Sequence, residues 1–459
     1  MRHRGRQRDF GMAERAQNSA VVFASGVIER SASARTGTGA HLRMRVAGSI
    51  TPVTPTVIAH EIEESRGLRP DTRRIDAIDM LRGLVIVLMV LDHVRDFFHA
   101  DAFAFNPLDP SRTTVALYAT RWITHLCAPT FVFLAGVSAY LQASRGKLPA
   151  RLSAFLLKRG LWLIALEVTV VSFGWSFSVG SPLVLQVIWA IGCSMIALSA
   201  LVWLPPVSVL AIGVAIVAGH NLLDPIVPED FGRAAFLWRL LHEGGPIPGV
   251  ANPIGIALYP ILPWVGVMAL GYGCGPLFTL DPARRDRLVP AAGLAILSTF
   301  AVLRGARLYG DPTAWDTHQT WVATTMSFFD VTKYPPSLHY VLVTLGLVLT
   351  IWPLLTRLRG RAADVLVTLG AVPLFVYVVH IYLTHALAIA ANAAAGRDVA
   401  GLFDTFRKAV TSPDRLQGLG FELPVVFAAW LVVLVLLYPP ARWFASVKAR
   451  RRDWWLSYL

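Results

Sequence analysis

The sequence predicts an all-α, polytopic membrane protein of about ten transmembrane helices, and three observations carry this prediction. Hydrophobic residues make up 55% of the 459 residues and charged residues only 15%, whereas a soluble protein of this length needs more polar surface. Apolar runs near the spanning length recur through most of the chain, and the mean hydropathy is +0.54. The net charge of +13 is gathered in short Lys and Arg blocks between these runs, which indicates membrane topology rather than nucleic-acid binding.

Residues 1–72 differ in composition from the rest of the chain. They are rich in Arg, Ser, Thr, Ala and Gly and have no sustained apolar periodicity, so we expect a disordered, basic, cytosolic extension. The apolar stretch 20–28 is too short for a span and makes a poor signal-peptide core. Met44 offers an alternative start nearer the folded part. Residues 73–459 are expected to form the membrane domain.

The predicted spans follow one another after a pair of arginines at residues 73 and 74. They lie near 78–98, 120–142, 156–176, 182–204, 206–222, 254–277, 288–304, 337–355, 366–394 and 422–444. Pro205 and Pro206 separate the fourth span from the fifth, because proline removes a helix donor. The three cysteines lie within apolar runs without metal-ligand spacing, so no disulfide framework is expected.

The charges of the connections predict the topology. With the N-terminus inside, the short inner connections are basic, for example around Arg145, Arg285 and Arg359. The outer connections, 99–119, 223–253, 305–336 and 395–421, are longer and mixed in sign. The positive-inside rule then places both termini in the cytosol and requires an even number of spans.

The first span carries an arginine and a histidine that are candidates for a binding and a catalytic role. Arg82 and His93 are eleven positions apart, so they share one helix face with about 16 Å of rise between them. The functional interpretation is a cytosol-facing anion site at Arg82 and an acid–base or acyl-accepting imidazole at His93. The alternative is that Arg82 pairs with Asp79 as a topology anchor and that His93 caps a buried polar contact. A polar ridge follows at helical spacing, formed by Asp92, Arg95, Asp96 and His99.

Two further histidines are candidate catalytic residues. His125 falls near the outer end of the second span, where the alternative is an interfacial histidine in water. His380 lies deep in the ninth span, where the alternative is a hydrogen bond between helices. Histidines near the outer side suggest a histidine-rich vestibule, namely His99, His220 and His339. Their spacings do not match a metal motif, so no metal is expected. In the connection before the eighth span, Asp330 is expected to pair with Lys333.

Several motifs resemble those of a known enzyme family. Arg82 and His93 fit the Arg-x10-His signature of acyltransferase-3-like membrane acyltransferases. The segments Asp-Met-Leu-Arg-Gly at 79–83 and His-Leu-Cys-Ala-Pro-Thr-Phe-Val-Phe-Leu-Ala-Gly at 125–136 narrow the resemblance. So do Val-Thr-Lys-Tyr-Pro-Pro-Ser at 331–337, Leu-Gly-Ala-Val-Pro-Leu-Phe-Val-Tyr-Val-Val-His at 369–380, and the C-terminal Arg-Arg-Arg-Asp-Trp-Trp-Leu-Ser-Tyr-Leu. Over residues 73–459 the chain resembles bacterial relatives of heparan-alpha-glucosaminide N-acetyltransferase, long described only as a domain of unknown function.

The resemblance implies an acyl-CoA-dependent acyltransferase. In the lysosomal enzyme, acetyl-CoA is used on the cytosolic side and a sugar amine is acetylated on the other side, with a membrane histidine at the centre. The lysosomal histidine lies in the loop after the first span; here that loop begins with His99, and His125 stands where the lysosomal protein has an acidic residue. The broader signature favours His93. Arg82, with Arg151 and Arg159 of the inner basic connection, is expected to hold the CoA phosphates.

The sequence therefore predicts a membrane acyltransferase of the bacterial inner membrane, with acetyl-CoA as the expected co-substrate. The expected acceptor is a hydroxyl or amine of a glycan or lipid-linked sugar at the outer face. Membrane lipid is the expected environment, nucleic acid is not an expected partner, and an oligomer is possible. Two rival functions stay open: a transporter or channel for a small anion or sugar, and a non-catalytic partner in envelope biosynthesis. The absence of a recognisable inverted repeat disfavours the transporter.

Overall fold

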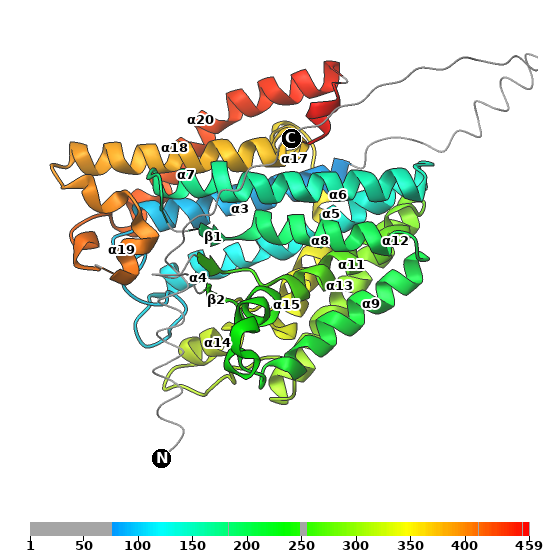
Figure 1. Ribbon diagram of the computed structural model, residues 1–459, viewed down its shortest axis with the longest axis horizontal. Coiled ribbons are helices and arrows are strands. Elements are labelled where there is room, and N and C mark those ends of the chain that lie inside the picture. Colours follow the sequence, from blue (N-terminus) through cyan, green and yellow to red (C-terminus); the bar gives the residue numbers. More distant parts are fainter. Residues whose placement is uncertain (1–75, 182, 248–254, 412, 452, 459) are drawn as a thin grey trace, which may run out of the picture. The chain divides into compact units, whose positions relative to one another are not determined.

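The computed structural model describes residues 76–181, 183–247, 255–411, 413–451 and 453–458. The predicted N-terminal extension, residues 1–72, lies outside these residues. The described part is mainly helical (Figure 1). Its longer helices are α3 (Asp76–Phe98), α4 (Val115–Ile123), α5 (Cys127–Ser144), α6 (Pro149–Leu166), α8 (Val187–Leu201), α9 (Pro206–Gly219), α11 (Ile261–Gly273), α13 (Pro282–Gly305), α14 (Trp321–Phe329), α15 (Leu338–Thr350), α17 (Arg361–Ala371), α18 (Pro373–Ala394) and α20 (Leu423–Arg450).

Shorter elements join these helices. The short helices are α7 (Ser172–Ser176), α10 (Ala235–Trp238), α12 (Gly275–Phe278), α16 (Trp352–Arg357) and α19 (Thr405–Thr411). Single turns that matter below are the π-helical η2 (Glu167–Val171) and η5 (Arg239–Glu243), and the 3-10 turns η1 (Thr124–Leu126), η3 (His220–Leu223) and η8 (Trp454–Ser457). Three short strands form one sheet in the order β1 (Leu183–Leu185), β3 (Gly255–Ala257), β2 (Gly245–Ile247), with β3 parallel to β1 and antiparallel to β2.

Six helical segments of the described chain are long and apolar enough to cross a membrane. They are Val115–Ser144, Pro206–Leu223, Pro282–Gly305, Leu338–Arg357, Pro373–Ala394 and Leu423–Arg450. This confirms a helical membrane protein, whereas ten spans are not all supported by length and composition. Helices α8 and α11 are apolar but shorter. Helix α3 has 23 residues and owes its charged character to the polar ridge near its end.

The structure corrects the limits of three predicted spans. The predicted span 182–204 begins as strand β1, and its helix starts only at Val187. The predicted span 254–277 likewise begins as β3, and its helix starts after Pro260. The long run 366–394 is two helices, α17 and α18, because Val372 leaves the helical conformation before Pro373. The break predicted at Pro205 and Pro206 is confirmed, since α9 starts at Pro206.

Glycines allow several helices to approach closely. A Cβ atom added to Gly83 of α3 would lie 2.0 Å from the Leu366 carbonyl oxygen, and one added to Gly370 of α17 would lie 1.9 Å from the Asp79 carbonyl oxygen. Helices α3 and α17 therefore touch backbone to backbone in both directions, as small residues permit in membranes. The same reciprocal contact joins α6 and α8 through Gly160 and Gly192.

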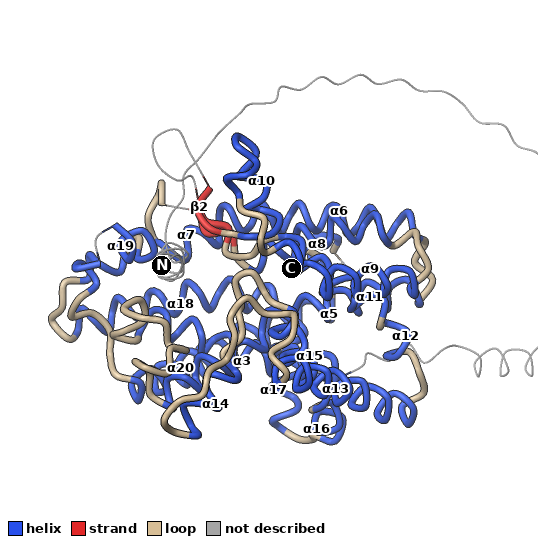
Figure 2. Tube along the Cα trace, turned by 90° about the horizontal axis from the view of Figure 1, so that it is seen from below, coloured by secondary structure: helices blue, strands red, loops and turns tan. Residues whose placement is uncertain are grey.

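Helices α3, α18 and α20 lie side by side, as Figures 1 and 2 both show. Figure 1 shows that α3 and α18 run in the same direction. Helix α20 runs back against them, because Phe421, just before it, donates its backbone N–H to the Phe98 carbonyl oxygen at the end of α3. The common direction of α3 and α18 places residues at similar depth along both helices next to each other.

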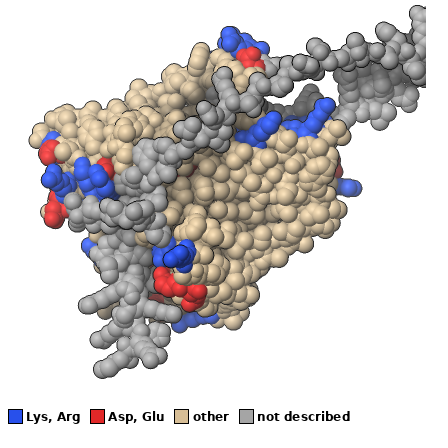
Figure 3. All heavy atoms as spheres, viewed as in Figure 1, with Lys and Arg blue, Asp and Glu red and all other residues tan. Residues whose placement is uncertain are grey.

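The described surface has the character expected of a protein in lipid. On the face drawn in Figure 3, a broad uncharged area separates Lys, Arg, Asp and Glu residues that gather toward its margins. Helix α20 is the most exposed of the six spans: only 17% of its most apolar stretch is buried within the protein, against 67% for Leu338–Arg357. Val435 of α20 is 70% exposed. Large apolar side chains exposed in this way are stable in hydrocarbon and costly in water.

Candidate active site

The structure brings two of the predicted histidines together inside the helix bundle. His93 of α3 and His380 of α18 face each other with 2.6 Å between His93 Nδ1 and His380 Nε2. Their rings are nearly parallel, with 4.9 Å between centroids and 11° between planes. His380 is fully buried, whereas His93 keeps part of its surface accessible. The pair is therefore closed on one side and open on the other.

The partners of His380 determine the proton positions in the neutral pair. His380 Nδ1 lies 3.0 Å from the Val376 carbonyl oxygen. A carbonyl oxygen only accepts, so His380 Nδ1–H donates to it and His380 Nε2 becomes the acceptor. His93 Nδ1–H must then donate to His380 Nε2. This leaves His93 Nε2 without a proton, so it is the basic atom of the pair.

Aromatic side chains surround the imidazole pair. Trp175 of α7 meets the His93 ring edge-on at 4.8 Å between centroids, and Tyr377 lies 6.2 Å from it in a similar orientation. Phe97 stacks on Trp175 at 5.0 Å. The π-helical turn η2 leads into α7, and such turns recur at functional sites. These rings limit the directions from which another molecule can reach His93.

A network of ion pairs lies next to His93 along α3. Arg121 Nη1 lies 3.0 Å from both carboxylate oxygens of Asp92. Arg95 Nη2 contacts Asp96 at 2.6 Å and Asp92 at 3.4 Å. Lys333 Nζ is 4.0 Å from Asp92. The predicted ridge thus exists for Asp92, Arg95 and Asp96, and its partners come from other segments of the chain.

Two features of this network differ from the sequence prediction or were missed by it. Lys333 approaches Asp92, an ion pair that the sequence did not predict, whereas the expected pair of Lys333 with Asp330 stays a prediction. Arg121 belongs to none of the motifs that predicted the site. The signal for it is a charged residue at the start of the predicted span 120–142, which is a costly position without a partner.

His125 lies outside the imidazole pair. Its Nδ1–H donates to the Trp122 carbonyl oxygen at 3.0 Å, and its own carbonyl oxygen accepts from the Tyr340 hydroxyl at 2.9 Å. It is 1% exposed and belongs to the 3-10 turn η1 between α4 and α5. The His125 ring also meets the Tyr340 ring edge-on at 5.3 Å, and its burial disfavours the alternative of an interfacial histidine in water.

The predicted anion-binding arginines lie at the opposite end of α3. Arg82 donates through Nη1 to Asp79 at 2.7 Å and through Nη2 to the Ser138 hydroxyl. The alternative interpretation of Arg82, a pair with Asp79, is thus present, and 20% of the Arg82 side chain stays exposed. The charges of Arg82 and Arg159 act on each other, and Arg151 is exposed on the first turn of α6.

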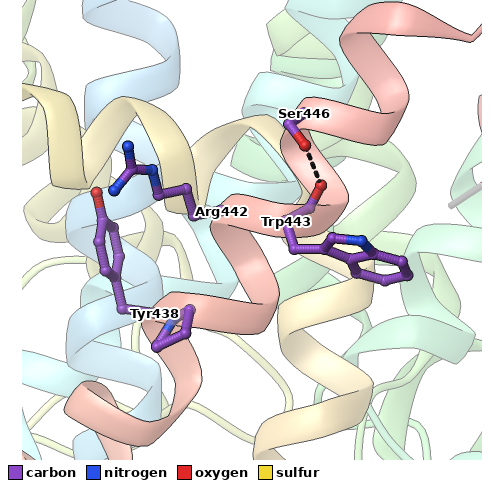
Figure 4. A pocket seen from close by; sticks show the side chains of 5 residues that line it. Tyr438, Arg442, Trp443 and Ser446 are labelled. Atoms are coloured by element: carbon purple, nitrogen blue, oxygen red, sulfur yellow. Dashed lines mark hydrogen bonds between the residues drawn. The ribbon is translucent and has the colours of Figure 1, made fainter.

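A pocket of about 380 Å³ lies on the last part of α20 (Figure 4). Figure 4 shows Tyr438 and Arg442 on one side of the helix and Trp443 on the other, with the Ser446 hydroxyl donating to the Trp443 carbonyl oxygen at 2.7 Å. Tyr, Trp and Arg side chains at the end of a span are typical of the membrane interface. None of the predicted site residues lines this pocket.

Long apolar helices, with charged residues at their ends, define a polytopic membrane protein whose bundle holds a hydrogen-bonded imidazole pair. The model of the family described as heparan-alpha-glucosaminide N-acetyltransferase, catalytic, matches residues 74–309, just over half of the chain. The chain belongs to this family of membrane N-acetyltransferases. A comparison with curated proteins gives no match. Arg82 and His93 lie within the matched residues, and His380 lies beyond them.

Proposed function

We propose that this protein transfers an acyl group, acetyl in the first instance, from cytosolic acyl-CoA to a sugar hydroxyl or amine at the outer face of the membrane. The observation that carries the proposal is the His93–His380 hydrogen bond. It fixes a basic nitrogen, His93 Nε2, on the same helix as Arg82. A base oriented by a second residue is the arrangement that general-base catalysis of acyl transfer uses.

The donor is proposed to bind at the Arg82 end of α3. The charges of Arg82 and Arg159 act on each other there, and Arg151 is exposed eight residues before Arg159 on α6. Lys147 Nζ lies 3.8 Å from the centroid of the Phe155 ring at the start of the same helix, α6. Phosphates of CoA suit such a site because Arg binds them through two hydrogen bonds at once. The pantetheine arm then has about 16 Å of helical rise to cover before its thioester reaches His93.

The chemical step follows from the free nitrogen of His93. As the acceptor oxygen or nitrogen attacks the thioester carbonyl carbon, His93 Nε2 takes the acceptor's proton. The carbon–sulfur bond breaks, and the imidazolium returns the proton to the CoA thiolate, so the products are the acylated acceptor and CoA thiol. In the alternative route, His93 Nε2 attacks the thioester carbonyl carbon and the carbon–sulfur bond breaks, which gives an acyl-imidazolium and the CoA thiolate; the acceptor then takes the acyl group from His93, and the acceptor's proton goes to the thiolate. His380 serves both routes by holding the His93 ring, and is a positioning residue.

The proposed topology has ten crossings with both termini in the cytosol of a bacterial cell and the protein in the inner membrane. Helices α3, α8 and α11 then complete the six long apolar spans, together with α6 continued by η2 and α7. The short, basic connections support this orientation, because they all fall on one side of the membrane, the side proposed for Arg82. Membrane lipid surrounds the bundle, and a glycan or lipid-linked sugar reaches the His93 side from outside.

An assay of acetyl transfer tests the proposal. Purified protein in liposomes is mixed with radiolabelled acetyl-CoA and glucosamine-bearing acceptors on the other side, and both CoA thiol release and acceptor labelling are measured. The expected result is acceptor-dependent release that His93→Ala abolishes and that His318→Ala, an exposed histidine before α14, leaves unchanged. Uptake of a labelled sugar or anion without acyl transfer, and without acetyl-CoA binding, would instead support the transporter.

A further inference from the structure

A second group of histidines lies where α9 ends and the following connection folds back. His220 opens the 3-10 turn η3, Asp224 follows four residues later, and His242 comes from the π-helical turn η5. The turn brings the side chains of His220 and Asp224 near each other. The imidazole pair lies on α3 and α18, so this group belongs to another part of the fold.

The three side chains have the spacing of metal ligands. One nitrogen of each histidine and one oxygen of Asp224 all lie within 4.8 Å of one another. His242 Nε2 is 3.0 Å from Asp224 Oδ1, and the two imidazole rings are 5.8 Å apart. Ligand atoms about 2.1 Å from a tetrahedral Zn²⁺ lie roughly 3.4 Å from one another. Side-chain rotation by on the order of 1 Å is enough to reach that geometry.

Three nitrogen atoms of this group have no hydrogen-bond partner among the described residues. His220 and His242 are each 2% exposed. Within the described part of the chain, both nitrogens of His220 and Nδ1 of His242 are buried without a hydrogen-bond partner. Leaving a buried polar atom unpaired costs about 1–3 kcal/mol. An ion between the rings gives a nitrogen of His220 the partner that it lacks.

Asn221 holds the carboxylate of Asp224 in place. The Asn221 side chain donates to Asp224 Oδ2 at 2.9 Å, and its carbonyl oxygen accepts the backbone N–H of Leu338 at 2.9 Å. Asn221 therefore fixes Asp224 to the first residue of α15. Outer-shell hydrogen bonds of this kind orient metal ligands in known sites. Asp224 keeps 24% of its side chain exposed, which leaves an entry path for an ion.

We propose that His220, Asp224 and His242 bind a divalent transition metal ion, with Zn²⁺ as the best match. Two imidazoles and one carboxylate suit Zn²⁺, whereas Mg²⁺ and Ca²⁺ prefer oxygen ligands only. His242 would bind as the neutral imidazole, with its proton moved from Nε2 to Nδ1, so that Nε2 coordinates the ion beside Asp224 Oδ1 and water completes the fourth position. Such an ion joins α9, the connection to η5 and, through Asn221, α15. The sequence did not indicate this site, because His242 lies eighteen residues beyond Asp224.

Zinc binding by the full-length protein in detergent tests the proposal. The protein is purified without a polyhistidine tag, stripped with EDTA, and titrated with Zn²⁺ by calorimetry; a separate stripped sample is titrated with Co²⁺ and its visible absorption recorded. We expect about one ion per chain and a tetrahedral Co²⁺ spectrum. Asp224→Asn preserves shape and removes the charged ligand, so it should weaken Zn²⁺ binding at least about 10-fold. His220→Ala should do the same.

His318→Ala is the matched control, because His318 is exposed on a different connection and should leave binding unchanged. Each variant is checked for an unaltered elution profile, so that loss of binding is not loss of the fold. The proposal is overturned if the stripped wild-type protein takes up no Zn²⁺ at this stoichiometry. It is also overturned if folded Asp224→Asn and His220→Ala variants bind Zn²⁺ as tightly as the wild type.

Discussion

The orientation of the His380 ring decides which nitrogen of His93 is able to accept a proton. The Val376 carbonyl oxygen accepts a hydrogen bond from His380 Nδ1–H, and His380 Nε2 accepts one from His93 Nδ1–H. A single backbone carbonyl oxygen therefore sets the tautomer of a side chain on another helix. Because His380 is fully buried, no water competes for these hydrogen bonds. His93 Nε2 remains the only ring nitrogen of the pair with a free lone pair in the neutral state.

Substitution of the three candidate histidines separates their roles. His93→Ala should lower kcat for acetyl transfer by roughly 10²–10⁴-fold, the usual contribution of a general base, without loss of CoA binding. His380→Ala should lower kcat by a smaller factor and leave KM for acetyl-CoA near its original value, because it only orients His93. His125→Ala should retain transfer in whatever fraction of the protein folds. Steady-state kinetics in liposomes give these values.

The opposite pattern would place the site elsewhere. If His93→Ala keeps full transfer activity while His99→Ala or His125→Ala loses it, the catalytic histidine lies in the outer connection, as in the lysosomal relative. His99 is the more accessible of these two side chains, since His125 is 1% exposed. Burial and proximity of Arg95 lower the pKa of His99, which sits just beyond α3, so it too is available in its neutral form.

Arginine substitutions test the donor site. Arg82→Ala should weaken acetyl-CoA binding by about 1.5–3 kcal/mol, the value of hydrogen bonds to a charged group, or roughly 10–150-fold. Arg159→Ala should act in the same direction. Arg112→Ala is the control, because Arg112 is an exposed arginine of the connection 99–119. Calorimetric titration of acetyl-CoA gives the affinities; equal values for Arg82→Ala and Arg112→Ala would remove Arg82 from the site.

Sequence spacing was informative about the site only within one helix. The eleven-residue step from Arg82 to His93 defines a shared face of α3, because helical geometry alone determines it. The approach of His380 depends on how α18 packs on α3, and no periodicity contains that information. The same holds for Arg121, which needs Asp92 from another segment to be stable at membrane depth.

Helices α3 and α17 are in direct backbone contact, so a substitution in this contact tests how tightly the helices pack. Gly83 and Gly370 each leave room for the backbone of the other helix, and Gly370 lies against Asp79, the partner of Arg82. A side chain at residue 370 has to push the Asp79 backbone away. Loss of this contact should therefore lower the stability of the bundle and displace Arg82.

Gly370→Ala should destabilise the protein by about 1–3 kcal/mol, the usual cost of overpacking. It should also weaken acetyl-CoA binding through the displaced Asp79–Arg82 pair. Gly305→Ala is the matched control, because a Cβ atom at Gly305, at the end of α13, meets nothing within 4 Å. Thermal unfolding followed by size-exclusion chromatography in detergent compares the two. A Gly370→Ala protein as stable as Gly305→Ala would mean that the helices separate at little cost.

Helix positions were predictable because apolar runs are long, whereas helix ends required the structure. The run 366–394 has no charged interruption, so its apolar length does not mark the boundary between α17 and α18; Pro373 is the signal for it. Residues 183–185 and 255–257 are as apolar as the helices that follow them. They form strands because they pair with one another across the bundle, which a sequence window does not register.

Reporter fusions test how the whole chain crosses the membrane. Fusions after residues 150, 285 and 360 should report the cytosol, because the connections there are short and basic. Fusions within 230–250 and 400–415 should report the outside. A paired alkaline phosphatase and green fluorescent protein assay reads both sides. A cytosolic signal from 230–250 would contradict ten crossings with cytosolic termini.

His93 and His380 stand 287 positions apart in the chain. At a synthesis rate of about 5–20 residues per second, roughly 15–60 s pass between the appearance of the first imidazole at the ribosome and that of the second. In the proposed topology, helix α3 enters the membrane at the start of that interval with its acidic and basic side chains and without α18. Arg121 follows within seconds and neutralises Asp92, whereas His93 waits for nearly the whole chain. The hydrogen-bonded imidazole pair therefore forms only when translation is almost complete, and a chain that stops short of residue 380 lacks it.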